Sequence, residues 1–276
     1  MPNWQRIKVL VTVTAYPSLS LRSGESVCVA GIRLDTSEPA WVRLYPMDLR
    51  GSSAAVRIRK WDVIEVDVTP ALDDHRTESR KPRMDTIEVV GHLGTDKGWA
   101  VRRSFVEPLI LPTYAKHLAA AAGPARPSLA AVRFGELLAL EVEKRAPADL
   151  EKLQTKAEAI ANRLSLFDDA LPDPAEPIPW SWYVTVKWPD EGTSHRLKLI
   201  DWEICQQWRR ERHKRADAHA YILEHWRSRV FGEKSDVTLF LGNQHRFQDQ
   251  WLLLGVFWPP KRSEVDDGQA ELGFEL

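Results

Sequence analysis

The chain is 276 residues long; 43% of its residues are hydrophobic and 28% are charged. These shares are typical of folded globular proteins and exclude a globally disordered or fibrous chain. No apolar run reaches the roughly 18 residues of a membrane-spanning helix, and the first ten residues are too polar for a secretory signal. We therefore expect a cytoplasmic protein without a membrane partner. At roughly 150 residues per domain, the length predicts two domains or one large one.

The cysteine content and the charge limit the chemistry further. Neither Cys28 nor Cys205 has a second thiol at metal-site spacing, which excludes a disulfide framework and a zinc ribbon. The net charge is −1, so any affinity for a polyanion must come from a local patch. The unusual count is 12 tryptophans, whose rings can fill a core or stack on bases.

The N-terminal third predicts short strands separated by polar turns. β-Branched or alternating segments at 7–14, 26–34, 40–45, 62–69 and 86–92 carry this pattern. A helix is predicted over 99–109, where Val101, Phe105 and Leu109 share one face. Strands are predicted again at 129–132 and 136–143. These elements favour a small barrel with a helical appendage over residues 1–148.

The C-terminal half predicts a second barrel. Apolar residues recur at helical spacing over 150–166, and four prolines between 172 and 179 follow, so residues 149–179 are predicted as a helix and linker. Strands at 182–188, 196–200, 237–241 and 251–257 enclose a helical region over 202–231. The predicted second domain is 180–260, with a flexible acidic tail over 261–276. The fold class is mainly β with helical insertions (α+β).

No motif of a common enzyme class is present. The chain lacks a phosphate-binding loop, a Rossmann glycine fingerprint, a nucleophile elbow and a zinc-protease helix motif. Two groups remain as alternatives for a metal-dependent nuclease or nucleotide hydrolase: Glu65, Asp67 and Glu78, or His195, Asp201 and His245. Solvent-facing carboxylates and a helix cap at Asp201 explain the same residues. We therefore assign no catalytic residue, metal ligand or cofactor from the sequence.

Cationic residues gather in the first half of the chain. Arg76, Arg80, Lys81 and Arg83 lie within eight residues, and Arg102 and Arg103 follow on the predicted helix. The strand period places Trp41, Arg43 and Tyr45 on one face, where rings could stack on bases and the guanidinium could meet a phosphate. The alternative is that the two rings are core residues and that Arg43 pairs with Glu65 or Asp67.

The second half offers two more polar groups. Arg209, Arg210, Arg212, Lys214 and Arg215 form a run in which Glu211 is the one counter-charge, typical of a solvated helix face or of a phosphate-binding surface. His245 lies in a polar loop over 242–246 between two predicted strands. Loops between barrel strands are common ligand sites.

Several short segments, taken in order, resemble a known family. They are Cys28-Val29-Ala30-Gly31-Ile32, Trp41-Val42-Arg43, Asp62-Val63-Ile64-Glu65, Ser128-Leu129-Ala130-Ala131-Val132, Arg196-Leu197-Lys198-Leu199-Ile200-Asp201 and Phe240-Leu241-Gly242-Asn243. Together they resemble the prokaryotic dual OB-fold-containing domain family. The chain departs from that pattern at Leu44-Tyr45-Pro46 and has a longer helical insertion after Asp201.

The resemblance implies that both barrels are OB-like and that the protein binds nucleic acid without established catalytic residues. It also implies a role in a prokaryotic defence or mobile-element system, with a separately encoded effector protein as partner. The leading hypothesis is an accessory protein that binds single-stranded DNA or RNA through Trp41, Arg43, Tyr45, Arg76, Arg80, Lys81, Arg83, Arg102, Arg103, Arg209, Arg210 and His245. The alternatives are the metal-dependent hydrolase and a protein-binding scaffold that uses exposed tryptophans.

Overall fold

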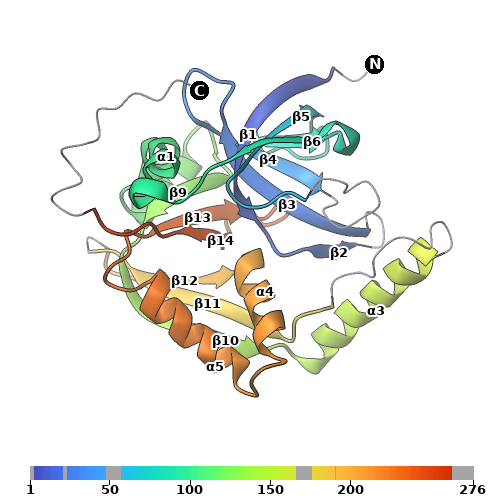
Figure 1. Ribbon diagram of the computed structural model, residues 1–276, viewed down its shortest axis with the longest axis vertical. Coiled ribbons are helices and arrows are strands. Elements are labelled where there is room, and N and C mark those ends of the chain that lie inside the picture. The colour runs from blue at the N-terminus through green and yellow to red at the C-terminus, as the bar shows by residue number, and fades with distance from the viewer. Residues whose placement is uncertain (1–2, 21–23, 48–56, 166–175, 190, 263–276) are drawn as a thin grey trace.

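The computed structural model describes residues 3–20, 24–47, 57–165, 176–189 and 191–262, which form two seven-stranded sheets and a few helices. Figure 1 shows the first sheet (blue to teal) above the second (yellow-green to red). The predicted fold class, mainly β with helical insertions and two OB-like barrels, is confirmed. In these segments no helix has both the length and the hydropathy of a membrane span.

The first barrel is built from the N-terminal strands. They are β1 (Gln5–Thr14), β2 (Ser18–Ser20), β3 (Gly24–Arg33), β4 (Ala40–Met47), β5 (Asp62–Pro70), β6 (Ser79–Pro82) and β7 (Glu88–His92). Five of them close in the order β1-β3-β4-β6-β5, because β1 pairs with β3 and also with β5. β4 and β6 run parallel. This order, with parallel third and fifth barrel strands, is that of an OB fold.

Alternation along the strands gives the first barrel its interior. On β5, Ile64, Val66 and Val68 are buried inside the barrel, whereas Glu65 and Asp67 point outward. Because successive side chains of a strand point to opposite faces, this one segment supplies both an apolar core and a polar surface.

The second barrel repeats this connectivity. Its strands are β8 (Ile110–Leu111), β9 (Leu129–Arg133), β10 (Glu136–Lys144), β11 (Trp180–Lys187), β12 (Ser194–Leu199), β13 (Thr238–Asn243) and β14 (Trp251–Phe257). The order is β10-β11-β12-β14-β13-β9-β8, with β12 and β14 parallel. β9 pairs with β13 and β10 pairs with β11. Since only Phe134 and Gly135 separate β9 from β10, the two are halves of one bent strand that closes the barrel.

The bend at Gly135 depends on the missing side chain. A Cβ atom built at Gly135 would lie 2.2 Å from the carbonyl oxygen of Lys187 and 3.2 Å from the Cα of Trp188. The indole Nε1 of Trp188 donates a hydrogen bond to the carbonyl of Arg133 at 2.7 Å, on the other side of the bend. Close approach of two backbones is a common reason for glycine within a strand.

The helices lie in the connections between strands. They are α1 (Asp96–Val106), α2 (Tyr114–Ala122), α3 (Pro147–Ser165), α4 (Trp202–Glu211) and α5 (Ala218–His225), with short helices η1 (Met84–Thr86), η2 (Glu107–Leu109) and η3 (Trp226–Val230). The helices predicted over 99–109, 150–166 and 202–231 correspond to α1, α3 and the series α4, α5 and η3. Asp201 caps α4 by accepting a hydrogen bond from the amide of Glu203.

The predicted domain boundaries need correction. β9 and β10 fall within the predicted first domain, 1–148, yet they pair with strands of the second barrel. The segment predicted as an inter-domain linker, 149–179, therefore joins β10 to β11 inside the second barrel. Proline density marks where regular structure stops, but it does not show which strands pair across the gap. Residues 166–175 of that segment and 263–276 of the predicted tail lie outside the described residues.

The two barrels pack face to face through one apolar cluster. The outer side chains of β1, β3 and β4 meet those of β9, β13 and β14; members include Leu10, Ala30, Ile32, Leu129, Ala131, Phe240, Leu254 and Phe257. The ring of Trp41 meets Phe240 edge-on, with centroids 5.8 Å apart. The amide of Tyr16 also donates to the carbonyl of Ile200 at 2.7 Å. The two barrels are therefore held together by a third apolar cluster that lies between them.

Replacing Gly135 with alanine is expected to lower the free energy of unfolding by about 1–3 kcal/mol, because the added methyl group overlaps the Lys187 backbone. The measurement is urea-induced unfolding. Gly192→Ala is the control, since a Cβ there meets no heavy atom within 4 Å. Equal stability of the two variants would contradict this account of the bend.

Candidate functional site

The face predicted from Trp41, Arg43 and Tyr45 points mainly into the molecule. Arg43 is 3% exposed, and its Nη2 donates to the carbonyl oxygen of Ser128, in the second barrel, at 2.9 Å. Tyr45 lies at the rim of this face, where its hydroxyl pairs with that of Ser26 at 3.1 Å. The predicted Arg43–phosphate contact is therefore corrected, because the packing of the barrels occupies this face.

The two arginines of α1 are also interior residues. Arg103 is 3% exposed and binds Asp236 at 2.6 Å and Glu107 at 3.1 Å. It ties α1 to the second barrel and cannot reach a phosphate in this structure. Arg102 donates twice to the carbonyl oxygen of Leu93, at 2.6 and 2.9 Å, and lines the cleft described below.

The cations predicted over 76–83 lie on β6 and on either side of it, at the far end of the first barrel. Arg76 is held by Asp74 and donates to the carbonyl of Asn243 at 2.9 Å. Arg80 binds two carbonyls of its own loop, Lys81 is exposed and Arg83 pairs with Asp85. β6 pairs with the end of β5, whereas the cleft lies beside its start, so the two basic groups are separated by the length of β5.

The two neighbouring arginines of α4, Arg209 and Arg210, lie in different environments. Arg209 donates to the hydroxyl of Tyr16 at 2.6 Å and to the carbonyl of Glu176, so it joins α4 to the first barrel. Arg210 is exposed and lines the cleft. The remaining predicted residue, His245, lies on the loop between β13 and β14 beside Asp74, away from this helix.

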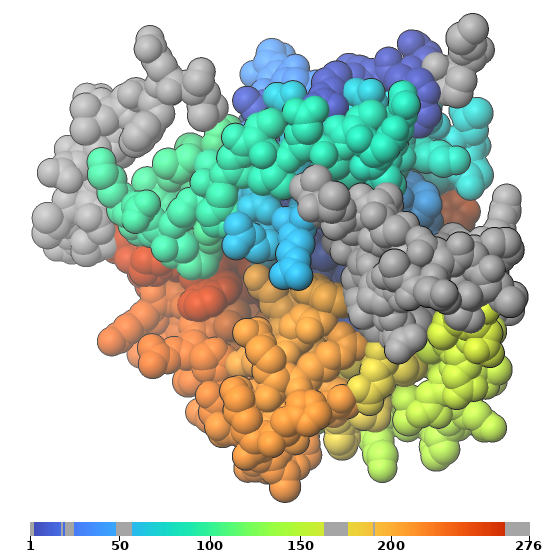
Figure 2. Space-filling model, turned by 45° about the vertical axis from the view of Figure 1, so that its right-hand side comes forward, coloured from blue at the N-terminus to red at the C-terminus, as the bar shows by residue number. Residues whose placement is uncertain are grey.

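A cleft between the first barrel and helix α4 brings aromatic and charged side chains of both barrels together. It consists of two pockets, of about 620 and 880 Å³, that share Lys60 and Glu203 as a partition. Volumes of this size are typical of ligand sites. In Figure 2, light-blue atoms of the segment before β5 lie directly above the orange atoms of α4 and α5.

Tryptophan rings line much of this cleft. The five are Trp61, Trp99, Trp202, Trp226 and Trp258. The centroids of Trp99 and Trp258 are 5.6 Å apart. The guanidinium of Arg102 lies 4.6 Å from the ring of Trp61 and 4.8 Å from that of Trp99, within cation–π range. Five of the twelve tryptophans in the sequence thus form one aromatic surface.

Two of these rings depend on unusual backbone. Trp61 has φ +72° and Trp99 has φ +67°, and Lys97 and Gly98 before Trp99 are also left-handed. Bulky residues rarely adopt positive φ, and each such residue costs of the order of 1–3 kcal/mol. Such strain is found most often at binding sites, where the surrounding structure holds it in place.

The cleft concentrates positive charge in a chain whose net charge is −1. Its lining includes six Lys or Arg residues, Arg57, Arg59, Lys60, Arg102, Arg210 and Lys214, against three carboxylates, Asp201, Glu203 and Glu211. Arg57, Arg59, Arg210 and Lys214 are exposed. The exposed cations lie at the rim and the buried ones at the base.

At the base, Lys60 and Asp201 form a buried ion pair. The Nζ of Lys60 lies 3.7 Å from Asp201, 3.1 Å from Glu203 and 3.1 Å from the carbonyl oxygen of Val256. Burial lowers the pKa of Lys60, but the two carboxylates outweigh it and hold the pKa above its usual value, so Lys60 stays cationic. Burial also raises the pKa of Asp201 to about 6, against the opposing effect of Lys60.

The two acidic groups considered for metal catalysis do not assemble. Glu65 and Asp67 lie 3.5 and 3.6 Å from Arg6, while Glu78 accepts hydrogen bonds from the amide and hydroxyl of Ser128. His195 pairs with Glu191 and Asp201 caps α4, so neither joins His245. The pairing of strands far apart in the sequence places these residues in different parts of the molecule, and their spacing along the chain does not show that pairing.

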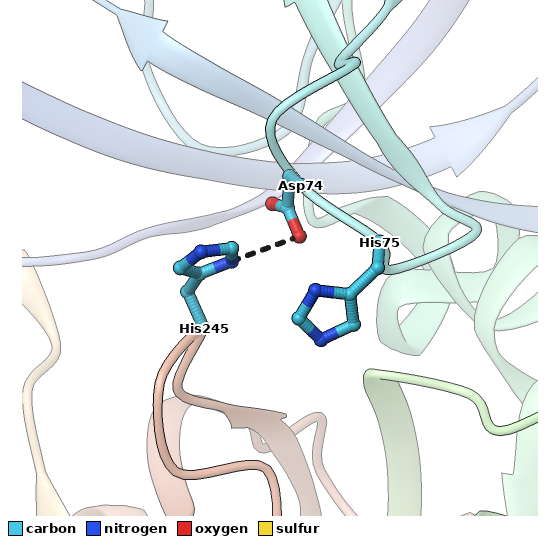
Figure 3. A group of neighbouring side chains, drawn as sticks. All are labelled: Asp74, His75 and His245. Carbon is cyan, nitrogen blue, oxygen red and sulfur yellow. Dashed lines mark hydrogen bonds and ion pairs between the residues drawn. The ribbon is translucent and has the colours of Figure 1, made fainter.

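Within the described residues, the only group of three potential metal ligands is Asp74, His75 and His245 (Figure 3). Burial alone would raise the pKa of Asp74, but hydrogen bonds from Arg76 and Ser79 outweigh it and hold that pKa below its usual range. Asp74 is therefore ionised at neutral pH.

Two family models match the chain in succession. Residues 5–108 match a domain of unknown function (DUF8758), and residues 114–272 match another domain of unknown function (DUF8757). The chain belongs to the DUF8757 family. The gap between the two matches lies after α1, which agrees with the corrected boundary between the barrels.

The comparison with curated proteins finds no match. Among solved structures, the crystal structure of the p204 HINb domain is similar at 11% identity, covering 95% of this chain and 97% of that chain, with a TM-score of 0.27. A TM-score this low supports no argument about fold or function.

Sequence reasoning missed most of the cleft. Lys60, Trp61, Trp99, Trp202 and Trp258 come from four separate segments, none of which forms a motif. Besides the predicted cations Arg102 and Arg210, the indication in the sequence was the high tryptophan count. It could not place the rings, because they meet only after the barrels pack.

The free energy of unfolding of the wild type, relative to that of the Asp201→Asn variant, is expected to fall as the pH rises from about 4 to about 7. The folded protein holds the Asp201 proton up to about pH 6, whereas the unfolded chain releases it near 3.8, so this contribution is lost as the pH rises through 6. The expected difference is about 2–3 kcal/mol. Asparagine retains the helix cap. Urea-induced unfolding of both proteins at several pH values measures this difference. Parallel pH profiles of the wild type and the variant would contradict the prediction.

Proposed function

We propose that the protein binds single-stranded nucleic acid in the cleft between its two barrels. The observation that carries the proposal is the combination, in one cleft, of five tryptophan rings with more cations than carboxylates. Proteins that bind single strands combine a positively charged groove with aromatic platforms for the bases.

The bases would contact the partly exposed rings. Trp99, Trp202 and Trp258 are half-buried, so part of each ring remains accessible from the cleft. Trp61 and Trp226 are buried and support the wall behind them. Stacking of a base on an aromatic side chain contributes about 1–3 kcal/mol and depends little on sequence.

The phosphates would contact the rim. Arg59, Arg210 and Lys214 are exposed there on both sides of the cleft, the first on the first barrel and the other two on or just after α4. The buried Lys60 stays with its two carboxylate partners, so the exposed cations of the rim would carry the phosphate contacts. Arg210 and Arg102 are the residues of the sequence-based set that belong to this site.

A single strand fits this lining better than a duplex. Stacking needs unpaired bases whose faces are accessible, and the bases of a duplex are already stacked on one another. Two adjoining pockets of about 620 and 880 Å³ would receive successive bases on either side of the Lys60–Glu203 partition.

The resemblance to the dual OB-fold-containing family extends the proposal. On that basis the chain is a divergent relative that acts as an accessory protein with a separately encoded effector, in a prokaryotic defence or mobile-element system. Copurification of a partner encoded nearby, retained after nuclease treatment, would test this extension.

Arg210→Ala combined with Lys214→Ala is expected to weaken single-strand binding roughly tenfold at low salt and to reduce the slope of log affinity against log salt by about 1.4, because two phosphate contacts are lost. The measurement is fluorescence anisotropy with labelled single-stranded DNA and RNA over a salt series. The matched control is Lys152→Ala with Lys156→Ala, two exposed lysines on α3, away from the cleft.

A second double variant locates the site. Arg80→Ala with Lys81→Ala changes the basic group beside β6 and is expected to leave the affinity within about twofold of wild type, because a cation that touches no phosphate contributes little. If this variant weakens binding and the cleft variant does not, the cleft proposal is overturned. Wild-type protein that binds no single strand would overturn nucleic-acid binding altogether.

Trp258→Leu is expected to weaken binding by about 1–3 kcal/mol while leaving the salt slope unchanged, because a stacking platform is lost and no charge is removed. The same anisotropy titration measures both quantities. Trp180→Leu is the matched control, since Trp180 is half-buried and stacks on His219 outside the cleft. Equal effects of the two substitutions would show that Trp258 acts through folding.

A further inference from the structure

Two corresponding loops, one from each barrel, meet at the end of the molecule opposite the cleft. The loop between β5 and β6 carries Asp74 and His75, and the loop between β13 and β14 carries His245. In each barrel this loop joins the fourth and fifth barrel strands. Figure 3 shows the three side chains gathered between the two loops, with His245 directed at Asp74.

The three side chains offer ligand atoms in one place. One potential ligand atom from each residue lies within 4.8 Å of the other two. His245 Nδ1 lies 3.3 Å from Asp74 Oδ1, and the two imidazole centroids are 5.2 Å apart. Zinc–ligand bonds of about 2.0–2.2 Å place two ligands of a tetrahedral ion about 3.4 Å apart. Both histidines are exposed, so small rotations of their rings close the remaining distance.

The position of the Asp74 carboxylate is fixed by other contacts. Asp74 Oδ2 accepts hydrogen bonds from Arg76 and from Ser79, each at 2.7 Å. Arg76 also donates to the carbonyl of Asn243 at 2.9 Å and thereby links the two loops. Outer hydrogen bonds of this kind hold the carboxylate ligand of a metal in its orientation.

The geometry points to a binding site for a divalent transition-metal ion such as Zn²⁺, held by Asp74, His75 and His245. Two imidazoles and one carboxylate suit zinc, cobalt or nickel. Mg²⁺ and Ca²⁺ prefer oxygen ligands, and the single carboxylate here is already shared with Arg76. Three protein ligands leave a position open to water or to an anion. Because its ligands come from both barrels, the ion would join the two domains.

The test titrates the full chain, freed of metal with a chelator, with Zn²⁺ in a calorimeter and with Co²⁺ in a spectrophotometer. We expect one ion per chain, a visible Co²⁺ spectrum typical of four-coordination, and a higher Tm with Zn²⁺. His75→Asn with His245→Asn should lower the affinity by about hundredfold or more, beyond the 10–100-fold loss typical of outer-shell changes. The matched control is His213→Asn, an exposed histidine outside the group, which should bind as wild type.

Several results would overturn the site. They are the absence of saturable Zn²⁺ binding, equal affinity in the double variant and in His213→Asn, or displacement of Co²⁺ by millimolar Mg²⁺. The outcome is independent of nucleic-acid binding, because the double variant leaves every residue of the cleft unchanged and its single-strand affinity can be measured separately.

Discussion

The apolar contact between the barrels is the constraint on which the other features depend. The outer faces of β1, β3 and β4 are covered by β9, β13 and β14, with Ile32, Phe240 and Phe257 among the residues between them. Burying a large apolar side chain is worth about 1.5–3 kcal/mol, so a cluster of this size holds the barrels in one orientation. That orientation places α4 opposite the start of β5 and brings the two corresponding loops together.

This packing also explains the polar groups buried within it. Arg43 and Arg103 are charged, yet each is nearly inaccessible and each meets hydrogen-bond acceptors on the second barrel. A buried charge is tolerated when it is paired or hydrogen-bonded: Arg103 pairs with Asp236, and Arg43 donates to the carbonyl oxygen of Ser128. The two arginines therefore help to fix how one barrel is oriented on the other. Exposed cations such as Arg59, Arg210 and Lys214 remain around the cleft.

The cleft and the group of Asp74, His75 and His245 lie at opposite ends of the contact between the barrels, and they differ in chemistry. The cleft is aromatic and cationic, which suits bases and phosphates. The loop pair offers imidazole and carboxylate, which suit a transition metal. Backbone strain occurs at the cleft, where Trp61 and Trp99 have positive φ, and both rings contact the same guanidinium, that of Arg102.

The sequence by itself determined the local structure: alternation along 62–69 predicted β5, helical spacing over 150–166 predicted α3, and a helix cap was one of the two interpretations of Asp201. These features depend on neighbours in the chain. Only the tertiary structure decided that β9 joins the second barrel, that Arg43 is interior, and that Lys60, Trp99 and Arg210 meet in one cleft. Such contacts depend on which apolar faces pack together. The outer face of a strand can pack against a loop or against another barrel, and the alternation of its own sequence is the same in both cases.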